Sequence, residues 1–398
     1  MVAPLSQASN NSTGMSGYTS SCGSGANTSA YVGTQQLAML PGCSSSGFGK
    51  IERSTGNIAF GSDVTYTLGA DVDIHSEIYY NWCLPGLTTG SWVPNVGLYI
   101  LKRATIKVGE AVWETIDRES MTIQGLLELP SIQYTALINS WSSNEDVALP
   151  CCGSSKLMCC VKGGSRGQLF MAAMPYQTVT IAIEFADITG CFNTTPTPPN
   201  PANNVLTFDL YTKQHILSPY ERELMQSTDI LQLLSTTQHH SYPILSGILP
   251  GVRIPTIDLS FFNEYCTHIC VYIEGGSFKE IEFVYNGTSA QGMIPYSLCR
   301  SATMMGLSAN GYENYAVFQL ANTPCVTSLT VDQTHVAPFA GGDGVSNNRF
   351  DVIQFNATVG GPEDGGTTAG IPSGTIAHFV AFGAQSILYS QGGAVQNK

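Results

Sequence analysis

Residues 71–87 read DVDIHSEIYYNWCLPGL and residues 95–117 read NVGLYILKRATIKVGEAVWETID. In an extended chain, successive side chains point to opposite faces. In the first stretch Asp71, Asp73 and His75 then point one way, and Val72 and Ile74 point the other. Apolar residues of the second stretch also fall on alternate positions, namely Ile100, Ala104, Ile106 and Val108. The pattern predicts a half-buried antiparallel sheet.

More segments of the same kind follow along the whole chain, divided by clusters of Gly, Pro and Ser. The predicted strands lie within residues 64–68, 77–84, 96–108, 178–185, 205–217, 257–273, 279–287, 313–320, 348–355 and 375–383. Runs of short strands without alternating helices exclude a parallel α/β sheet and indicate β-sandwiches or jelly rolls.

A proline-rich segment divides the chain. Residues 192–204, FNTTPTPPNPANN, contain four prolines, which favour a stiff extended linker over a helix or central strand. We therefore expect a Pro-rich linker at residues 195–204, between a first jelly roll at 31–194 and a second at 205–398. Residues 1–30 are rich in Ser, Gly, Asn and Thr, so we expect a flexible N-terminal arm that orders only on a partner.

One helix is predicted in the second half. Ser218 suits the N-cap, Pro219 the first helical position and Glu221 the capping-box position. An apolar stripe follows, formed by Leu224, Met225, Ile230, Leu231 and Leu234. His239 and His240 are interpreted as the polar exit from this helix.

Composition narrows the classes of function. Of 398 residues, 43% are apolar and 11% charged, and the formal net charge is −13. With no basic run to bind phosphates, we expect no direct nucleic-acid binding. Neither a secretory leader pattern nor an apolar run of about 20 residues occurs, so we expect a soluble chain made in the cytosol with no transmembrane segment. The sequence has no H-E-x-x-H, Walker, Rossmann or cupin His-x-His motif, so we expect no enzyme.

The order of these segments resembles the double jelly-roll major capsid proteins of nucleocytoplasmic large DNA viruses. Residues 71–87 look like that family's strand ending in a Leu-Pro pair, and residues 95–117 look like its strand leading through a Gly-rich turn to an Ile-Asp pair. Further similar stretches are MPYQTVTIAIEF at 174–185, SPYERELMQSTDILQLL at 218–234, IDLSFFNEYCTHICVYI at 257–273, YNGTSAQ at 285–291, GVSNNRFDVIQF at 344–355 and TIAHFVAFGAQSILYSQGGAV at 375–395.

The resemblance implies an all-β chain of two tandem eight-stranded antiparallel jelly rolls, with long loops and a short helix in the second half. It implies a homotrimer whose six jelly rolls form a pseudo-hexagonal capsomer, and capsomers that tile an icosahedral virion shell. The implied partners are further copies of the chain, neighbouring capsomers, and minor capsid and penton proteins. The implied location is the outer capsid shell, after synthesis in the host cytoplasm, and no catalytic residue, cofactor or metal is implied.

A carbohydrate- or receptor-binding β-sandwich is the alternative function. Its motivation is four tryptophans in the first half that could stack on sugars, Trp82, Trp92, Trp113 and Trp141. Their position beside apolar strands favours a role in the core instead.

Cysteines supply two candidate sites. The pairs Cys151-Cys152 and Cys159-Cys160 flank a Gly-Ser loop, where reduced thiols are favoured over a disulfide across the loop or a structural zinc. On a predicted strand, Cys266, His268 and Cys270 share one face and could bind zinc, but ordinary packing or an interface is favoured. Asp71, Asp73 and His75 could likewise bind a cation, with a solvated or inter-subunit edge favoured.

Six N-x-S/T sequons occur, at Asn10, Asn11, Asn27, Asn193, Asn286 and Asn356. Chance occurrence in a Ser/Thr-rich chain is the favoured interpretation. If glycans are attached, Asn193 and Asn286 are the first candidates, because both fall in predicted loops.

Overall fold

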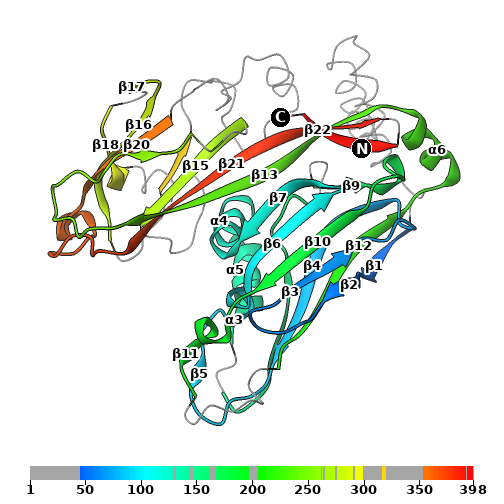
Figure 1. The fold of residues 1–398 in the computed structure, drawn as a ribbon, viewed down its shortest axis with the longest axis horizontal. Helices are drawn as coiled ribbons and strands as arrows, with labels where there is room; N and C mark the ends of the chain where they lie inside the picture. The colour runs from blue at the N-terminus through cyan, green and yellow to red at the C-terminus, as the bar shows by residue number, and fades with distance from the viewer. Residues whose placement is uncertain are drawn as a thin grey trace, which may run out of the picture.

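A computed structural model describes residues 45–129, 131–143, 147–161, 167–196, 205–260, 262, 265–273, 276–289, 292–298, 316–319, 353–390 and 392–397. Two antiparallel β-sandwiches lie side by side in this part of the chain (Figure 1). The arm expected at residues 1–30 lies outside the described residues.

The first sandwich has two five-stranded sheets. One contains β1 (Ser45–Lys50), β12 (Thr207–Ile216), β4 (Ile74–Leu84) and β8 (Cys151–Lys156) in that order, with β9 (Leu169–Phe170) also paired to β4. The other contains β2 (Glu52–Gly56), β3 (Asp63–Thr67), β10 (Val179–Phe185), β6 (Leu101–Val108) and β7 (Ala111–Asp117). A separate pair joins β5 (Ser91–Trp92) to β11 (Phe192–Thr194).

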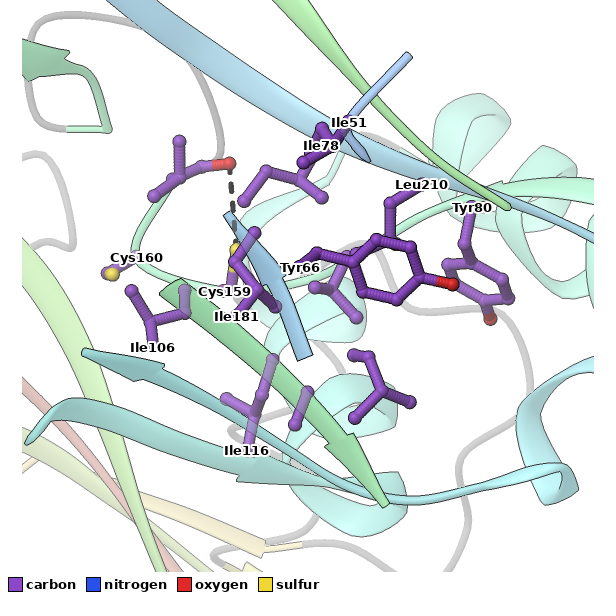
Figure 2. Packing of buried hydrophobic residues seen from close by; sticks show 14 of the residues in the cluster. Ile51, Tyr66, Ile78, Tyr80, Ile106, Ile116, Cys159, Cys160, Ile181 and Leu210 are labelled. Atoms are coloured by element: carbon purple, nitrogen blue, oxygen red, sulfur yellow. Dashed lines mark hydrogen bonds between the residues drawn. The ribbon is translucent and has the colours of Figure 1, made fainter. Parts of the chain in front are cut away.

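Strict alternation along the strands creates the first core. In β10 every second side chain is buried, beginning with Val179, and the intervening ones are half-buried. Figure 2 shows Tyr66, Ile106, Ile181 and other side chains of both sheets meeting in this core. The alternation predicted for residues 96–108 is confirmed for Ile106 and Val108, which are buried on β6.

The second sandwich repeats this architecture. One sheet contains β13 (Ile230–Ile244), β21 (Thr375–Ser390), β15 (Tyr265–Ile273) and β19 (Ala316–Gln319), with β22 (Gly393–Asn397) also paired to β21. The other contains β14 (Ile257–Asp258), β20 (Ile353–Val359), β16 (Phe278–Tyr285) and β17 (Thr288–Ser289), with β18 (Ile294–Pro295) also paired to β16. The Asn286-Gly287 turn joins β16 to β17, and both residues have positive φ, 47° and 79°, as a tight primed hairpin turn requires.

The boundary between the sandwiches lies later than the proline-rich segment. Strand β12 follows that segment, yet it pairs with β1 and β4 of the first sandwich. Its Phe208 and Leu210 belong to the first core. Residues 205–216 are therefore part of the first sandwich, and the linker predicted at 195–204 connects two strands of one sandwich. The prolines predict a linker, but they do not reveal which sheet receives the next strand.

Four α-helices have both ends within the described residues: α3 (Val96–Tyr99), α4 (Arg118–Glu128), α5 (Ser131–Trp141) and α6 (Pro219–Ser227). Three short 3-10 helices are η1 (Met171–Ala173), η2 (Ile188–Cys191) and η6 (Pro362–Asp364). The start of α6 is as predicted, because Ser218 and Glu221 form a reciprocal capping box.

The predicted length of that helix is wrong. It ends at Ser227, and Ile230, Leu231 and Leu234 lie on β13. Antiparallel pairing along the whole of β13 with β21 outweighs the local helical spacing. His239 and His240 are consequently mid-strand residues of β13 and not a helix exit.

The contribution of the second core to stability can be tested at Phe355. Phe355 is fully buried and makes tilted or edge-on ring contacts with Phe278, Phe283 and Phe379, at centroid distances of 4.9–5.7 Å. Replacing Phe355 with Ala should lower the free energy of unfolding by about 3–5 kcal/mol in chemical denaturation. Leu245→Ala is the control, because Leu245 is 83% exposed and should change it by less than about 0.5 kcal/mol. Equal effects would contradict the described core.

Candidate functional site: the junction between the two sandwiches

The two sandwiches meet where β7 and α4 lie against the long strands β13 and β21 (Figure 1). Ile123 of α4 packs on the outward face of the second sandwich, in a cluster with Cys270, Tyr272, Val380 and Phe382. The opposite face of the same strands holds the second core, through residues such as Ile269 and Phe379. This sheet is thus covered by apolar side chains on both faces.

A buried carboxylate joins three segments at this junction. Glu114 of β7 is only 4% exposed. Its Oε1 accepts hydrogen bonds from the backbone N–H of Thr237 at 2.9 Å and from the Thr237 hydroxyl at 3.0 Å. Its Oε2 accepts a hydrogen bond from the backbone N–H of Cys160. Because a buried carboxylate is stable only when such donors surround it, Glu114 fixes the position of β13 against β7.

A second set of polar contacts crosses the junction at the end of β7, three residues after Glu114. Asp117, the N-cap of α4, is hydrogen-bonded to Nδ1 of His239 on β13. His239 Nε2 lies 3.0 Å from Nδ1 of His378 on β21. Burial opposes ionisation of Asp117, but hydrogen bonds from His239 and Ser120 outweigh it, so the pKa of Asp117 lies below its ordinary value.

The C-terminal hairpin is tied to the first sandwich as well. Gln177 exchanges hydrogen bonds with the backbone of Ala394, donating at 3.3 Å and accepting at 2.7 Å. Gln232 of β13 donates to the carbonyl of Gln168 at 2.9 Å and accepts from the Tyr389 hydroxyl at 2.8 Å. Apolar side chains of β13, β21 and β22 enter the first core, namely Ile230, Leu234, Ile387, Tyr389 and Ala394. The first core therefore continues across the junction.

Asp73 has a structural role that sequence reasoning missed. It is buried and binds both Nε and Nη2 of Arg222 on α6, at 2.7 and 2.8 Å, while also accepting from the Leu217 N–H at 2.7 Å. The bidentate pair raises the pKa of Arg222 and holds the crossover helix on the first sandwich.

The structure contradicts the cation site and the solvated edge considered for the DVDIH motif. Asp71 is exposed, but Asp73 and His75 are buried, so the three do not form a solvated edge. Arg222 occupies both carboxylate oxygens of Asp73, which leaves no cation role for them. Burial lowers the pKa of His75.

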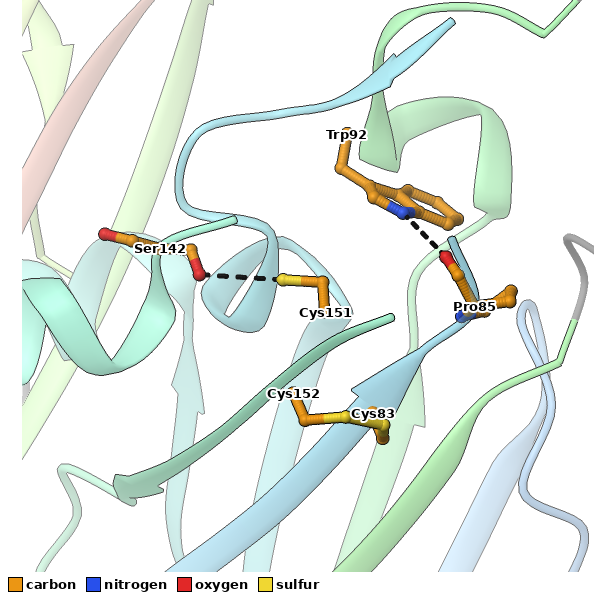
Figure 3. The surroundings of a disulfide bond; sticks show 6 residues. All are labelled: Cys83, Pro85, Trp92, Ser142, Cys151 and Cys152. Carbon is orange, nitrogen blue, oxygen red and sulfur yellow. Dashed lines mark hydrogen bonds between the residues drawn. A yellow bond between two sulfur atoms is a disulfide. The ribbon is translucent and has the colours of Figure 1, made fainter. Parts of the chain in front are cut away.

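Three cysteines of the two pairs are thiols, and the fourth forms a disulfide with a cysteine outside the pairs. Cys152 forms a disulfide with Cys83, which faces it across β4 and β8 (Figure 3). Cys151, Cys159 and Cys160 are buried thiols in the first core. The favoured interpretation, reduced thiols, is confirmed for these three cysteines and is wrong for Cys152. The alternative disulfide across the loop does not form, because strand pairing sets Cys152 opposite a cysteine 69 positions away. Buried thiols in an apolar core also make a poor zinc site.

The strand with Cys266, His268 and Cys270 is β15, as expected. Cys270 is fully buried among apolar side chains, and burial raises the pKa of its thiol, which disfavours the thiolate that zinc requires. This supports the packing interpretation for Cys270. The side chains of Cys266 and His268 lie outside the described part of the chain.

Asp117, Glu119 and His239 form a cluster whose ligand atoms lie within 4.8 Å of one another. Each is already engaged: Asp117 by Ser120, Glu119 by Arg118 at 2.8 and 2.9 Å, and His239 by Asp117 and His378. The positive end of α4 and the Arg118 cation both disfavour a metal ion here.

The remaining candidates are the four tryptophans considered for sugar binding and the two asparagines considered as glycan acceptors. All four tryptophans proposed as sugar platforms are buried, Trp82, Trp92, Trp113 and Trp141. Trp92 stacks on Phe192 at 4.7 Å and donates to the Pro85 carbonyl at 3.2 Å (Figure 3). Asn193 and Asn286 are exposed, and their use as glycan acceptors stays a prediction.

The role of Glu114 can be tested by an isosteric change. Glu114→Gln replaces one acceptor oxygen by an N–H donor that must face other donors. We expect a loss of about 1–3 kcal/mol in the free energy of unfolding by chemical denaturation. Glu110→Gln is the control, because Glu110 is exposed in the turn before β7. A Glu114→Gln protein as stable as the control would show that this carboxylate does not hold the junction.

Among the helices of the described ranges, none has the length and apolar character needed to cross a bilayer. No protein-family model matches the sequence. No curated protein matches it either.

Solved structures do match. VP54 of PBCV-1, as fitted into a reconstruction of the virophage Sputnik, superposes with a TM-score of 0.73 at 11% identity, over 89% of this chain and 97% of that chain. The Faustovirus major capsid protein gives a TM-score of 0.60 at 7% identity, over 87% and 91% of the two chains. A chain of the Sputnik virophage gives 0.55 at 6% identity, over 89% and 88%. The chain thus has the double jelly-roll fold of these viral capsid proteins.

Proposed function

We propose that this chain is the major capsid protein of a large DNA virus. The observation that carries the proposal is the pairing of two sandwiches of the same architecture, joined by a buried polar and apolar junction. Its likeness to solved capsid subunits over nearly the whole chain supports this interpretation. The tasks of such a subunit are mechanical, and no catalytic residue is assigned.

The finer architecture follows from symmetry. Three copies around a three-fold axis would present six similar sandwiches, which approximate a hexagon and can tile a shell through contacts that repeat between capsomers. Such a capsomer needs a constant angle between the two sandwiches of each subunit. The buried junction formed by Glu114, Asp117 and their partners on β13 supplies that constraint.

Under this proposal the partners are two further copies of the chain, neighbouring capsomers, and minor capsid and penton proteins. The protein would be made in the host cytoplasm and reside in the outer shell of the virion. Its net charge of −13 and lack of a basic run argue against direct contact with the genome.

Native mass measurement tests the trimer. We expect a species three times the 42.4 kDa chain mass at micromolar concentration, because stable capsomers need large obligate interfaces. Phe355→Ala serves as the control for misfolded material, since it should lower the trimer yield through loss of folded subunits. A folded monomer at this concentration would refute the trimeric capsomer.

The N-terminal arm can be tested separately. A chain lacking residues 2–30 should form trimers of unchanged stability but assemble poorly into shells, since a polar arm contributes mainly when it orders on a partner. Trimer formation is followed by native mass measurement and assembly by electron microscopy. Loss of the trimer on deletion would show that the arm is part of the subunit interface instead.

A further inference from the structure

A row of hydrogen-bonded and stacked side chains, two of them histidines, crosses the junction between the sandwiches. Asp117 comes from the first sandwich, and His239 and His378 come from β13 and β21 of the second. The His378 ring also stacks on Tyr272 of β15, with centroids 4.5 Å apart and planes inclined by 9°. His378 is 4% exposed, so its protonation is coupled to the packing around it.

The hydrogen-bond geometry limits how many protons the pair of histidines can hold. With both rings neutral, Nδ1–H of His239 donates to Asp117, and Nε2 of His239 accepts from Nδ1–H of His378. One additional proton is accommodated, because either ring can carry it while a donor still faces an acceptor. A second additional proton places N–H donors on both His239 Nε2 and His378 Nδ1, which lie 3.0 Å apart. That state breaks the hydrogen bond and sets two cations side by side, with ring centroids 5.2 Å apart.

Among the described residues whose contacts are known here, no further negative charge compensates a second proton. Asp117 supplies one negative charge, but Glu119 is paired with Arg118, whose guanidinium lies 4.3 Å from the centre of the Tyr99 ring. His240, next along β13, is half-buried, and burial together with His239 lowers its pKa, against the opposing effect of Asp258. Tyr272 contributes a neutral ring. The site therefore tolerates a net charge change of one proton far better than two.

We propose that Asp117, His239 and His378 form an acid-sensitive latch between the two sandwiches, closed with up to one extra proton and opened by a second. An unconstrained imidazole takes up its proton near pH 6.5, so the unfolded or opened chain binds more protons than the closed latch below that pH. Stability of the junction is then present at neutral pH and falls as the pH drops below about 6.5. In a shell built from this subunit, acid would loosen the angle between sandwiches. That consequence rests on the proposed capsid function, whereas the latch itself does not.

Hydrogen exchange of the full-length protein tests the latch directly. Peptides covering residues 113–120 and 234–241 should exchange about tenfold faster at pH 5 than at pH 7.5, after scaling for the intrinsic effect of pH on exchange. Peptides of β10, in the first core, should remain protected at both pH values. This readout concerns contacts within one chain, so its result is separate from the mass of the oligomer.

Two variants decide the mechanism. In His378→Asn the side-chain amide can donate to His239 but cannot take up a proton, so the acid acceleration should disappear. His215→Asn is the matched control: His215 is a half-buried histidine on β12, away from the junction, and its pKa is also lowered by burial. It should keep the wild-type response. If His378→Asn already exchanges rapidly at pH 7.5, His239→Gln offers the same comparison with an amide in place of the other ring. A wild-type junction insensitive to acid, or an acid response that survives both non-titrating variants, would overturn the proposal.

Discussion

The buried contact between β7 and β13 is the constraint on which the rest of the structure depends. Glu114 is buried and accepts hydrogen bonds from Thr237 and Cys160. A shift of β13 by one residue would leave this carboxylate facing side chains of the wrong face, at the large cost of a buried charge without partners. Apolar packing alone would tolerate sliding, so it is the polar contacts that make the junction specific.

The same junction connects local structure to a mechanical property. Strand β13 belongs to the second sandwich by its pairing with β21, yet its first residues complete the first core. Helix α6 precedes it and is held by the Asp73–Arg222 pair. The segment that connects the two sandwiches is therefore held against the first sandwich at α6 and along β13. The C-terminal hairpin is held there as well, through Gln177. Together these contacts make two sandwiches behave as one unit, which a subunit of a regular shell requires.

Much of the fold was accessible from the sequence, because alternation, turn residues and the Ser218–Glu221 capping box are local signals. The boundary between the sandwiches was not accessible, because the prolines predict a linker at 195–204 but only strand pairing assigns β12 to the first sandwich. The junction was missed for a similar reason. Asp117 and His239 are 122 positions apart, and neither residue type distinguishes a buried contact from a solvated loop. The one available signal was polar residues on apolar strands, such as Asp73 and Glu114, which must find buried partners.

The central claim is that each chain joins its own two sandwiches at a fixed angle. A cryo-electron microscopy map of the purified oligomer measures that angle directly. It predicts a six-lobed ring in which every chain supplies two adjacent lobes, with β7 against β13 of the same chain in each copy. A map in which β13 lies against β7 of a neighbouring copy, or in which the angle between the lobes of one chain varies from copy to copy, would contradict it.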